Sequence, residues 1–91
     1  MRTRKYGKPD ANQSAIVTAL RQIGAGVMIT SGNGQGEPDL IVGWQCRNVA
    51  LEIKMPGEKL TTPEETFKRL WPGEYYVVYS VEEAIKAVTR T

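Results

Sequence analysis

The sequence lacks histidine, has one cysteine and contains no long apolar run, and each absence excludes a class of protein. Without histidine there is no Ser-His or Cys-His nucleophile pair and no zinc site built on imidazole. The single cysteine, Cys46, cannot form an internal disulfide, so a reducing cytoplasm is the expected setting. No stretch approaches the roughly 20 apolar residues of a membrane span, so we expect no membrane contact. Any metal would need oxygen ligands, which favours Mg²⁺, with Mn²⁺ as a substitute.

Length and charge set further limits. The 91 residues suffice for one domain but not for two cores, and 41% hydrophobic residues are typical of a globular protein. A net charge of +2 gives little indication of a nucleic-acid partner. The first eight residues nevertheless hold a cluster of cations, namely Arg2, Arg4, Lys5 and Lys8. This cluster predicts either a flexible basic arm over residues 1–9 that contacts a phosphate backbone, or a plain solvated terminus.

The first third of the chain predicts a helix, a short strand and a glycine-rich loop. We expect the helix to begin with Asp10 as N-cap and Gln13 as its reciprocal capping partner, and to end at Gly24. Residues 27–30 are mostly apolar and β-branched, as in a strand. The loop over residues 31–36 is rich in glycine but lacks the Gly-Lys-Ser/Thr ending of a P-loop, so no nucleotide cofactor is expected.

Two strands joined by a short turn are expected next. Residues 39–43 and 48–54 are strand-like, and a turn near residues 45–47 would make them an antiparallel hairpin. Because side chains alternate along a strand, the second strand has two different faces. One face carries Val49, Leu51 and Ile53, and the other carries Ala50, Glu52 and Lys54.

The remainder of the chain predicts a helix, a strand and a last helix. The middle helix would have Thr62 as N-cap and Glu65 closing a capping box, and would end at residues 72–73. Residues 75–79 form an apolar, aromatic strand, and Ser80 caps the last helix. The element order is therefore α-β-β-β-α-β-α. This order predicts a single α/β (α+β) domain with a four-stranded mixed sheet flanked by helices, the last two strands being parallel.

Three charged side chains in the hairpin are the candidates for chemistry. Counting outward from the turn brings Asp39 to the Lys54 end of its partner strand, where Glu52 shares the face of Lys54. Asp39 and Glu52, with the backbone carbonyl of Ile53, would bind Mg²⁺. Bound Mg²⁺ polarises a phosphate and lowers the pKa of a water, and Lys54 would orient or deprotonate that water or neutralise the transition state. The pattern predicts phosphodiester hydrolysis, with Asp39, Glu52 and Lys54 as catalytic residues.

A simpler interpretation of the same residues exists. Glu-x-Lys on a strand is common and often forms a solvated ion pair that contributes less than about 1 kcal/mol. What favours the catalytic interpretation is the agreement of residue order, spacing and element order.

Several segments together resemble a known family. Residues 36–43 (Gly-Glu-Pro-Asp-Leu-Ile-Val-Gly), 51–54 (Leu-Glu-Ile-Lys) and 59–61 (Lys-Leu-Thr) resemble the PD-(D/E)XK nuclease superfamily, and most of all its VRR-NUC group and related phage proteins. Residues 10–13 and 80–84 are also similar to those phage proteins. The resemblance implies a restriction-endonuclease-like core, a metal-dependent DNA endonuclease and a phage or prophage source, with the protein in the host cytoplasm. It further implies a homodimer that cleaves branched DNA.

The resemblance assigns only Asp39, Glu52 and Lys54 directly. For a fourth site residue two alternatives remain: Gln13, which would bind metal through a water or its amide oxygen, and Glu64, at the start of the helix after the Glu-x-Lys strand. Lys59 is a further candidate for contact with DNA phosphates. Because the usual first-helix acid is missing, a non-catalytic nucleic-acid-binding module that keeps the nuclease fold is the alternative function.

Overall fold

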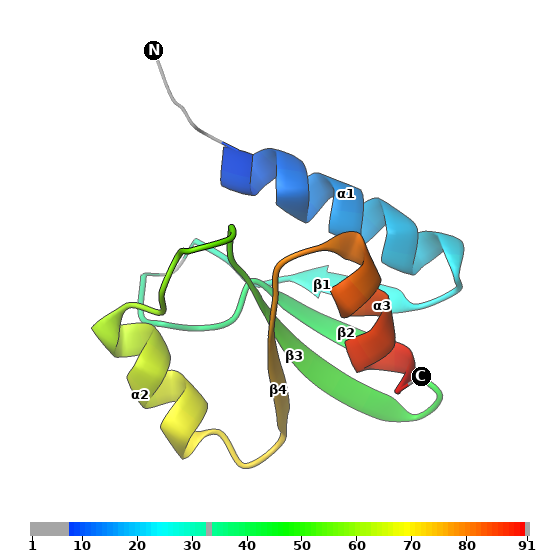
Figure 1. Ribbon diagram of the computed structural model, residues 1–91. Helices are drawn as coiled ribbons and strands as arrows, with labels where there is room; N and C mark the ends of the chain where they lie inside the picture. The colour runs from blue at the N-terminus through cyan, green and yellow to red at the C-terminus, as the bar shows by residue number, and fades with distance from the viewer. Residues whose placement is uncertain (1–7, 33, 91) are drawn as a thin grey trace.

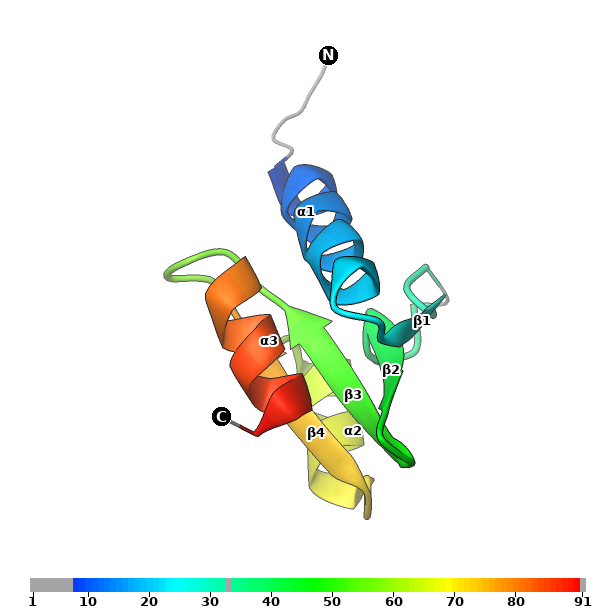
Figure 2. The ribbon, with the colours of Figure 1, turned by 90° about the vertical axis from the view of Figure 1, so that its right-hand side faces the viewer.

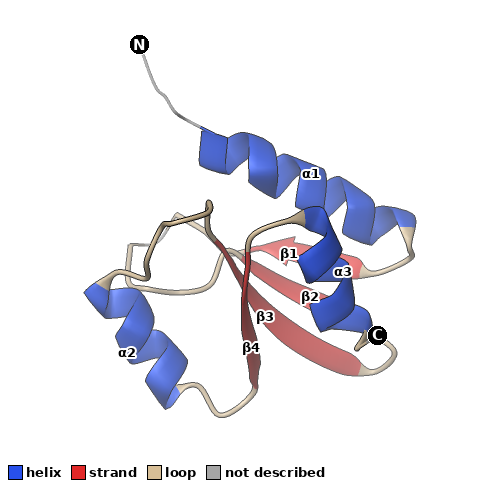
Figure 3. Cartoon of the chain, in the orientation of Figure 1, coloured by secondary structure: helices blue, strands red, loops and turns tan. Residues whose placement is uncertain are grey.

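A computed structural model describes residues 8–32 and 34–90, with side chains from residue 11 onward. The predicted element order α-β-β-β-α-β-α is confirmed in these residues (Figure 3). The elements are α1 (Lys8–Gln22), β1 (Gly26–Ile29), β2 (Leu40–Trp44), β3 (Arg47–Ile53), α2 (Thr62–Leu70), β4 (Glu74–Val78) and α3 (Val81–Thr89).

The four strands form one mixed sheet in the order β1-β2-β3-β4. The β1/β2 and β2/β3 pairs are antiparallel, and β3 pairs in parallel with β4. Parallel neighbours need a crossover connection, and here the segment containing α2 supplies it (Figure 1). The sheet predicted from the sequence, including its parallel last pair, is therefore confirmed.

The helices lie on both faces of the sheet, but only one face carries the main core. In Figures 1 and 2, α1 and α3 lie on one side of the sheet and α2 on the other. Ile16 and Leu20 of α1 and Val88 of α3 are fully buried against the strands. In α2, by contrast, no residue is buried. The helix therefore gains little stability from apolar burial and must be held by other contacts.

The β2–β3 hairpin fixes the register on which the site depends. Gln45 and Cys46 have φ values of 48° and 67°, and Trp44 pairs with Arg47, so the turn has two residues, both at positive φ. This is the geometry of a type I′ turn, whose twist matches that of the strands it joins. Counting back from the turn pairs Leu40 with Leu51. Asp39 therefore enters β2 beside Glu52.

Arg47, at the end of β3 far from Asp39 and Glu52, joins this strand to β4 and α3. Arg47 donates to both carboxylate oxygens of Glu74 at 2.9 and 2.6 Å, and to the carbonyl of Val88 at 2.6 Å. Tyr76 and Arg90 also contact the Glu74 carboxylate. Two parallel donors to one carboxylate make a strong, directional pair. The network ties β3, β4 and the C-terminal end of α3 together.

Two expectations for the first helix are wrong. Because α1 begins at Lys8, Asp10 is inside the helix and is not its N-cap. Gln13 is then also interior, and the capping role considered for it disappears. Lys8 and residue 9 belong to α1 rather than to an arm over residues 1–9. Arg2, Arg4 and Lys5 lie outside the described residues.

The middle helix is capped one residue earlier than predicted. Thr61, not Thr62, is the N-cap, and Glu64, not Glu65, closes the capping box. Ser80 caps α3 as expected, although the Glu83 carboxylate accepts from the N–H of Tyr79. Across the described part of the chain, no helix is both long and apolar enough to cross a membrane.

Candidate active site

The hairpin brings Asp39 onto the backbone of the Glu-x-Lys strand. Asp39 Oδ2 accepts a hydrogen bond from the N–H of Ile53 at 2.8 Å. Asp39 lies just before β2, and Glu52 and Ile53 end β3. The convergence of Asp39 and Glu52 expected from strand register is thus present in the structure. It is a local consequence of the two-residue turn.

The segment that leads into β2 is itself anchored. The N–H of Thr30, just after β1, donates to the carbonyl of Asp39 at 2.8 Å, and the Thr30 hydroxyl donates to the carbonyl of Pro38 at 2.7 Å. Pro38 is buried. These contacts fix the backbone on both sides of the Pro38–Asp39 bond, so the carboxylate of Asp39 is held in place before any ligand arrives.

Lys54 is buried and surrounded by acids. Its side chain is only 6% exposed, and its Nζ lies 2.7 Å from Glu64 Oε1, 3.6 Å from Glu58 Oε2 and 3.8 Å from Glu52 Oε2. A buried ammonium is costly unless it is paired, and these three carboxylates provide that pairing. The solvated surface pair considered from the sequence is therefore excluded for Glu52 and Lys54, since both are buried.

Glu58 belongs to this cluster and was missed in the sequence. The N–H of Glu58 donates to the carbonyl of Met55 at 2.9 Å, and Gly57 has φ of 85°, so a tight turn brings Glu58 back toward Lys54. The Pro56-Gly57 dipeptide is typical of such a turn. The sequence signal that could have identified Glu58 was this dipeptide, because a turn there places the residue after Gly57 beside the end of β3.

These side chains share one cavity of about 350 Å³. Gln13 reaches it from α1 and Ser31 and Gly32 from the loop after β1, while Asp39, Glu52, Ile53, Lys54, Glu58 and Glu64 complete the lining. Both candidates for the fourth site residue, Gln13 and Glu64, are therefore present. Lys59 and Glu65 are exposed and do not line the cavity.

The two carboxylates are crowded. Burial and then the neighbouring charges of Asp39 and Glu64 raise the pKa of Glu52 to about 8. Burial also raises the pKa of Asp39, although the hydrogen bond from Ile53 opposes the shift. Each shift reflects first the cost of removing a carboxylate from water and then, mainly for Glu52, the neighbouring negative charges. A cation bound between these groups would relieve that cost.

The cation of the cluster is stabilised by the same acids. Burial acts to lower the pKa of Lys54, but the hydrogen bond and charge of Glu64, with the charges of Glu58 and Glu52, raise it above its ordinary value. For Glu64, burial acts to raise the pKa, and the hydrogen bonds from Lys54 and Thr61 outweigh it, so the pKa is lowered. Lys54 is therefore an ammonium and Glu64 a carboxylate at neutral pH.

The donor set fits a hard divalent cation. Glu52 Oε1 is buried and has no hydrogen-bond partner among the described residues, so it is available as a ligand. Carboxylate, carbonyl and amide oxygens are what Mg²⁺ prefers. Among the described side chains no group of three acidic, histidine or cysteine residues converges as a metal cluster. Asp39 and Glu52 would therefore need the carbonyl of Ile53, the amide of Gln13 or water to complete a coordination shell.

A solved structure described as a VRR_NUC domain has the same architecture. It superposes with a TM-score of 0.68 at 22% sequence identity, covering 89% of this chain and 94% of that chain. The chain has the VRR_NUC fold. Within this fold the cavity described above lies where the β2–β3 hairpin, the loop after β1 and the N-terminal turn of α2 meet. No family model matches the sequence, and no curated protein matches it either.

Proposed function

We propose that this protein is a Mg²⁺-dependent endonuclease that hydrolyses phosphodiester bonds in DNA. The observation that carries the proposal is the meeting of Asp39, Glu52 and a buried Lys54 in one cavity, with Glu52 Oε1 unpaired among the described residues. The likeness to a VRR_NUC domain supports it. Uncatalysed phosphate-ester hydrolysis is so slow that enzymes remove on the order of 20 kcal/mol from the barrier, which demands strong charge stabilisation.

The residues divide the chemistry among them. Asp39, Glu52 and the carbonyl of Ile53 would bind the metal, and Gln13 would hold a water near it. When bound, Mg²⁺ would polarise the phosphate and lower the pKa of a bound water. Lys54, paired with the carboxylates around it, would stabilise the transition-state charge, or orient or deprotonate the attacking water. The acidic lining would repel a phosphate by itself, which is the physical reason for metal dependence.

Cleavage assays test this proposal directly. Purified protein is incubated with linear duplex and with four-way junction DNA, with Mg²⁺, with Mn²⁺ or with EDTA. We expect cleavage only with metal, and loss of cleavage in Glu52→Ala by several orders of magnitude. Glu65→Gln, an exposed neighbour outside the cavity, is the matched control. Equal behaviour of wild type and Glu52→Ala on every substrate would exclude the proposal.

The alternative is a non-catalytic DNA-binding module with this fold. It predicts salt-sensitive DNA binding that survives Lys54→Ala and does not depend on metal. Calorimetric titration with Mn²⁺ separates the two functions, since a binding-only module has no reason to hold a metal between Asp39 and Glu52. Heat of binding in wild type that is absent in Glu52→Ala supports the nuclease.

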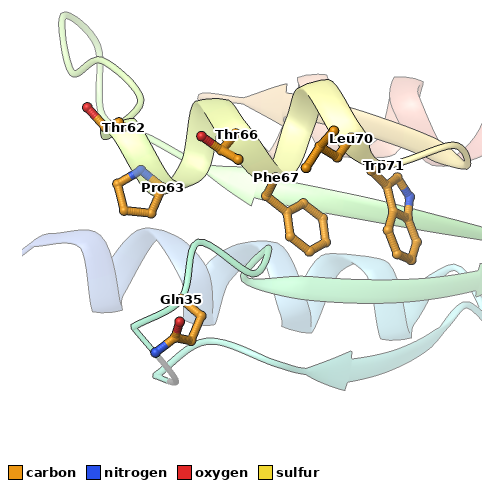
Figure 4. A pocket seen from close by; sticks show the side chains of 7 residues that line it. All are labelled: Gln35, Thr62, Pro63, Thr66, Phe67, Leu70 and Trp71. Carbon is orange, nitrogen blue, oxygen red and sulfur yellow. The ribbon is translucent and has the colours of Figure 1, made fainter.

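The proposal extends to branched DNA and to a homodimer, in a phage or prophage protein that acts in the host cytoplasm. The face of α2 that carries Phe67, Leu70 and Trp71 supports the dimer. Leu70 and Trp71 are 66% and 41% exposed, and with Phe67 they line an open groove of about 550 Å³ facing Gln35 (Figure 4). Exposed apolar surface of this kind is typical of an interface. Basic residues 2, 4, 5, 8 and 59 would contact DNA.

Sedimentation tests the dimer separately from catalysis. We expect twice the chain mass at micromolar concentration, and a single chain mass for Leu70→Glu, since a charge placed in an apolar contact is costly. Lys68→Glu, which changes charge on the same helix outside the groove, is the control. A wild type that sediments as a monomer would remove the dimer and leave the nuclease proposal unchanged.

A further inference from the structure

The contacts of α2 assign a role to Glu64 that goes beyond lining the cavity. We propose that Glu64 is a positioning residue, which holds the Lys54 ammonium where the phosphate charge develops. The proposal rests on the proposed function. Of the three carboxylates around Lys54 Nζ, Glu64 is nearest at 2.7 Å, whereas Glu58 and Glu52 lie 3.6 and 3.8 Å away. Only the Glu64 contact is a short, charge-assisted hydrogen bond.

A single oxygen of Glu64 accepts hydrogen bonds from both Lys54 and Thr61. Oε1 accepts from Lys54 Nζ and also, at 2.9 Å, from the N–H of Thr61. The N–H of Glu64 in turn donates to the Thr61 hydroxyl at 3.3 Å. This reciprocal capping box fixes the rotamer of Glu64 before Lys54 is considered. The side chain of Lys54 has four flexible carbons and many rotamers. A fixed hydrogen-bond partner restricts these rotamers and so fixes the position of the ammonium group.

The backbone of Glu64 is fixed as well, by a close approach of the loop after β1. Gly36 has φ of 88°, and a Cβ at that position would overlap the carbonyl of Pro63 and lie 3.1 Å from the N–H nitrogen of Glu64. The loop and the first turn of α2 are thus in backbone contact. No residue of α2 is buried, so this backbone contact and the packing of Phe67 on Tyr75 of β4 hold the helix against the sheet.

The geometry favours positioning over metal binding. Oε1 of Glu64 already accepts hydrogen bonds from Lys54 and Thr61, so only Oε2 remains for a metal unless both of these hydrogen bonds break. Glu52 Oε1, by contrast, has no hydrogen-bond partner in the described part of the chain. Glu64 therefore acts through Lys54, while Glu52 and Asp39 bind the metal.

The test compares Glu64→Ala and Glu64→Gln with wild type in steady-state cleavage of duplex DNA with Mg²⁺. Glu64→Ala lowers kcat by about 10- to 100-fold with little change in KM, because a displaced charge weakens the transition state more than the ground state. Glu64→Gln keeps an acceptor oxygen for both donors and restores most of kcat. Thr61→Ala removes the cap but keeps the ion pair, and loses less kcat than Glu64→Ala. Glu65→Ala is the matched control.

Three further measurements decide between the roles. In a Lys54→Ala background, adding Glu64→Ala causes no further loss, since the partner is already gone. Calorimetry shows Mn²⁺ affinity in Glu64→Ala within about threefold of wild type, and its metal-free crystal structure shows Lys54 Nζ displaced. Cleavage by wild type together with an unchanged kcat in Glu64→Ala, or a loss of Mn²⁺ binding in that variant, overturns the role of Glu64 and leaves the nuclease proposal standing. Absence of cleavage in wild type overturns the nuclease proposal itself.

Discussion

Two carboxylates of this protein have opposite electrostatic surroundings. Glu52 lies among other acids in a buried cavity, and its pKa is raised to about 8. Glu74 accepts two hydrogen bonds from Arg47, and its pKa is lowered to about 2. The first residue is costly to ionise in the folded chain, and the second is stabilised by ionisation. Glu52 therefore belongs to a site that a bound cation would stabilise, whereas the ionised Glu74 stabilises the fold itself.

The depressed pKa of Glu74 predicts a pH-dependent contribution to stability. A carboxylate with a lowered folded pKa stabilises the fold above its unfolded pKa, and this contribution is lost as pH falls from about 4.5 to about 2. We expect Glu74→Gln to lower the free energy of unfolding at neutral pH, and the difference from wild type to shrink through this window. Urea unfolding at several pH values measures it. Glu82→Gln, exposed in the first turn of α3, is the control; a pH-independent difference would contradict the prediction.

At the scale of elements, the β2–β3 hairpin turn contains a strained residue. Cys46 has φ of 67°, a conformation that costs a non-glycine residue about 1 kcal/mol or more. We expect Cys46→Gly to raise the free energy of unfolding by about 0.5 to 1 kcal/mol, the gain being reduced by the greater freedom of glycine in the unfolded chain.

Cys46→Ser is the matched control for this change, because it removes the thiol and keeps the strain. Chemical denaturation of the two variants and wild type gives the comparison. If glycine and serine have the same effect, the strain at the turn is not what limits stability.

The contact between the loop after β1 and α2 gives a second prediction at this scale. Gly36→Ala is expected to destabilise the fold by about 2 kcal/mol or more and to lower cleavage activity, because the new Cβ pushes against the carbonyl of Pro63. Gly34→Ala has a similar φ, 78°, but its Cβ meets no atom within 4 Å.

The difference between these two variants isolates the steric contact from the backbone strain that they share. Thermal unfolding and kcat are measured for both. Equal losses in Gly34→Ala and Gly36→Ala would show that the close approach to α2 is not what matters.

Sequence patterns predict the elements better than their ends. The hairpin and the parallel β3–β4 pair follow from short-range alternation and connection length, so both were predicted. The cap of α2 was not, because Thr61 with Glu64 and Thr62 with Glu65 satisfy the same capping pattern. The choice is made by a tertiary contact, since the observed cap uses Glu64, which also binds Lys54.

For the site as well, short-range patterns were enough for some residues, whereas others are placed by tertiary contacts. Asp39, Glu52 and Lys54 are brought together by one hairpin, and local register is enough to predict their meeting. Gln13 enters the cavity from a helix that packs across the sheet, and no spacing rule places it there. Its position depends on the burial of Ile16 and Leu20, which sets the rotation of α1.

For the whole molecule, metal binding and stability should be linked. A cation that binds only the folded state stabilises it by about 2.7 kcal/mol at a concentration 100 times its Kd. We expect Mg²⁺ to raise Tm of the wild type, by about 4–8 °C for each kcal/mol in a domain of this size. EDTA should reverse the effect.

Glu52→Gln provides the comparison, at ionic strength matched with NaCl. The variant loses the charge of a proposed ligand, so its Tm should respond little to Mg²⁺, while Glu65→Gln should respond as wild type does. A Tm increase of equal size in wild type and Glu52→Gln would place the bound cation somewhere else.

The parallel pairing of β4 with β3 also has a consequence for the order of folding. A hairpin closes within microseconds from neighbouring residues, whereas a parallel strand must wait for its crossover segment. Asp39 and Glu52 can therefore meet early, in a chain whose second half is still unfolded. Lys54 gains its Glu64 partner only when α2 docks, and its own N–H bonds to Val78 only when β4 joins the sheet. A partly synthesised chain would thus carry the two acids without a positioned cation, and cleavage would have to await the completed domain.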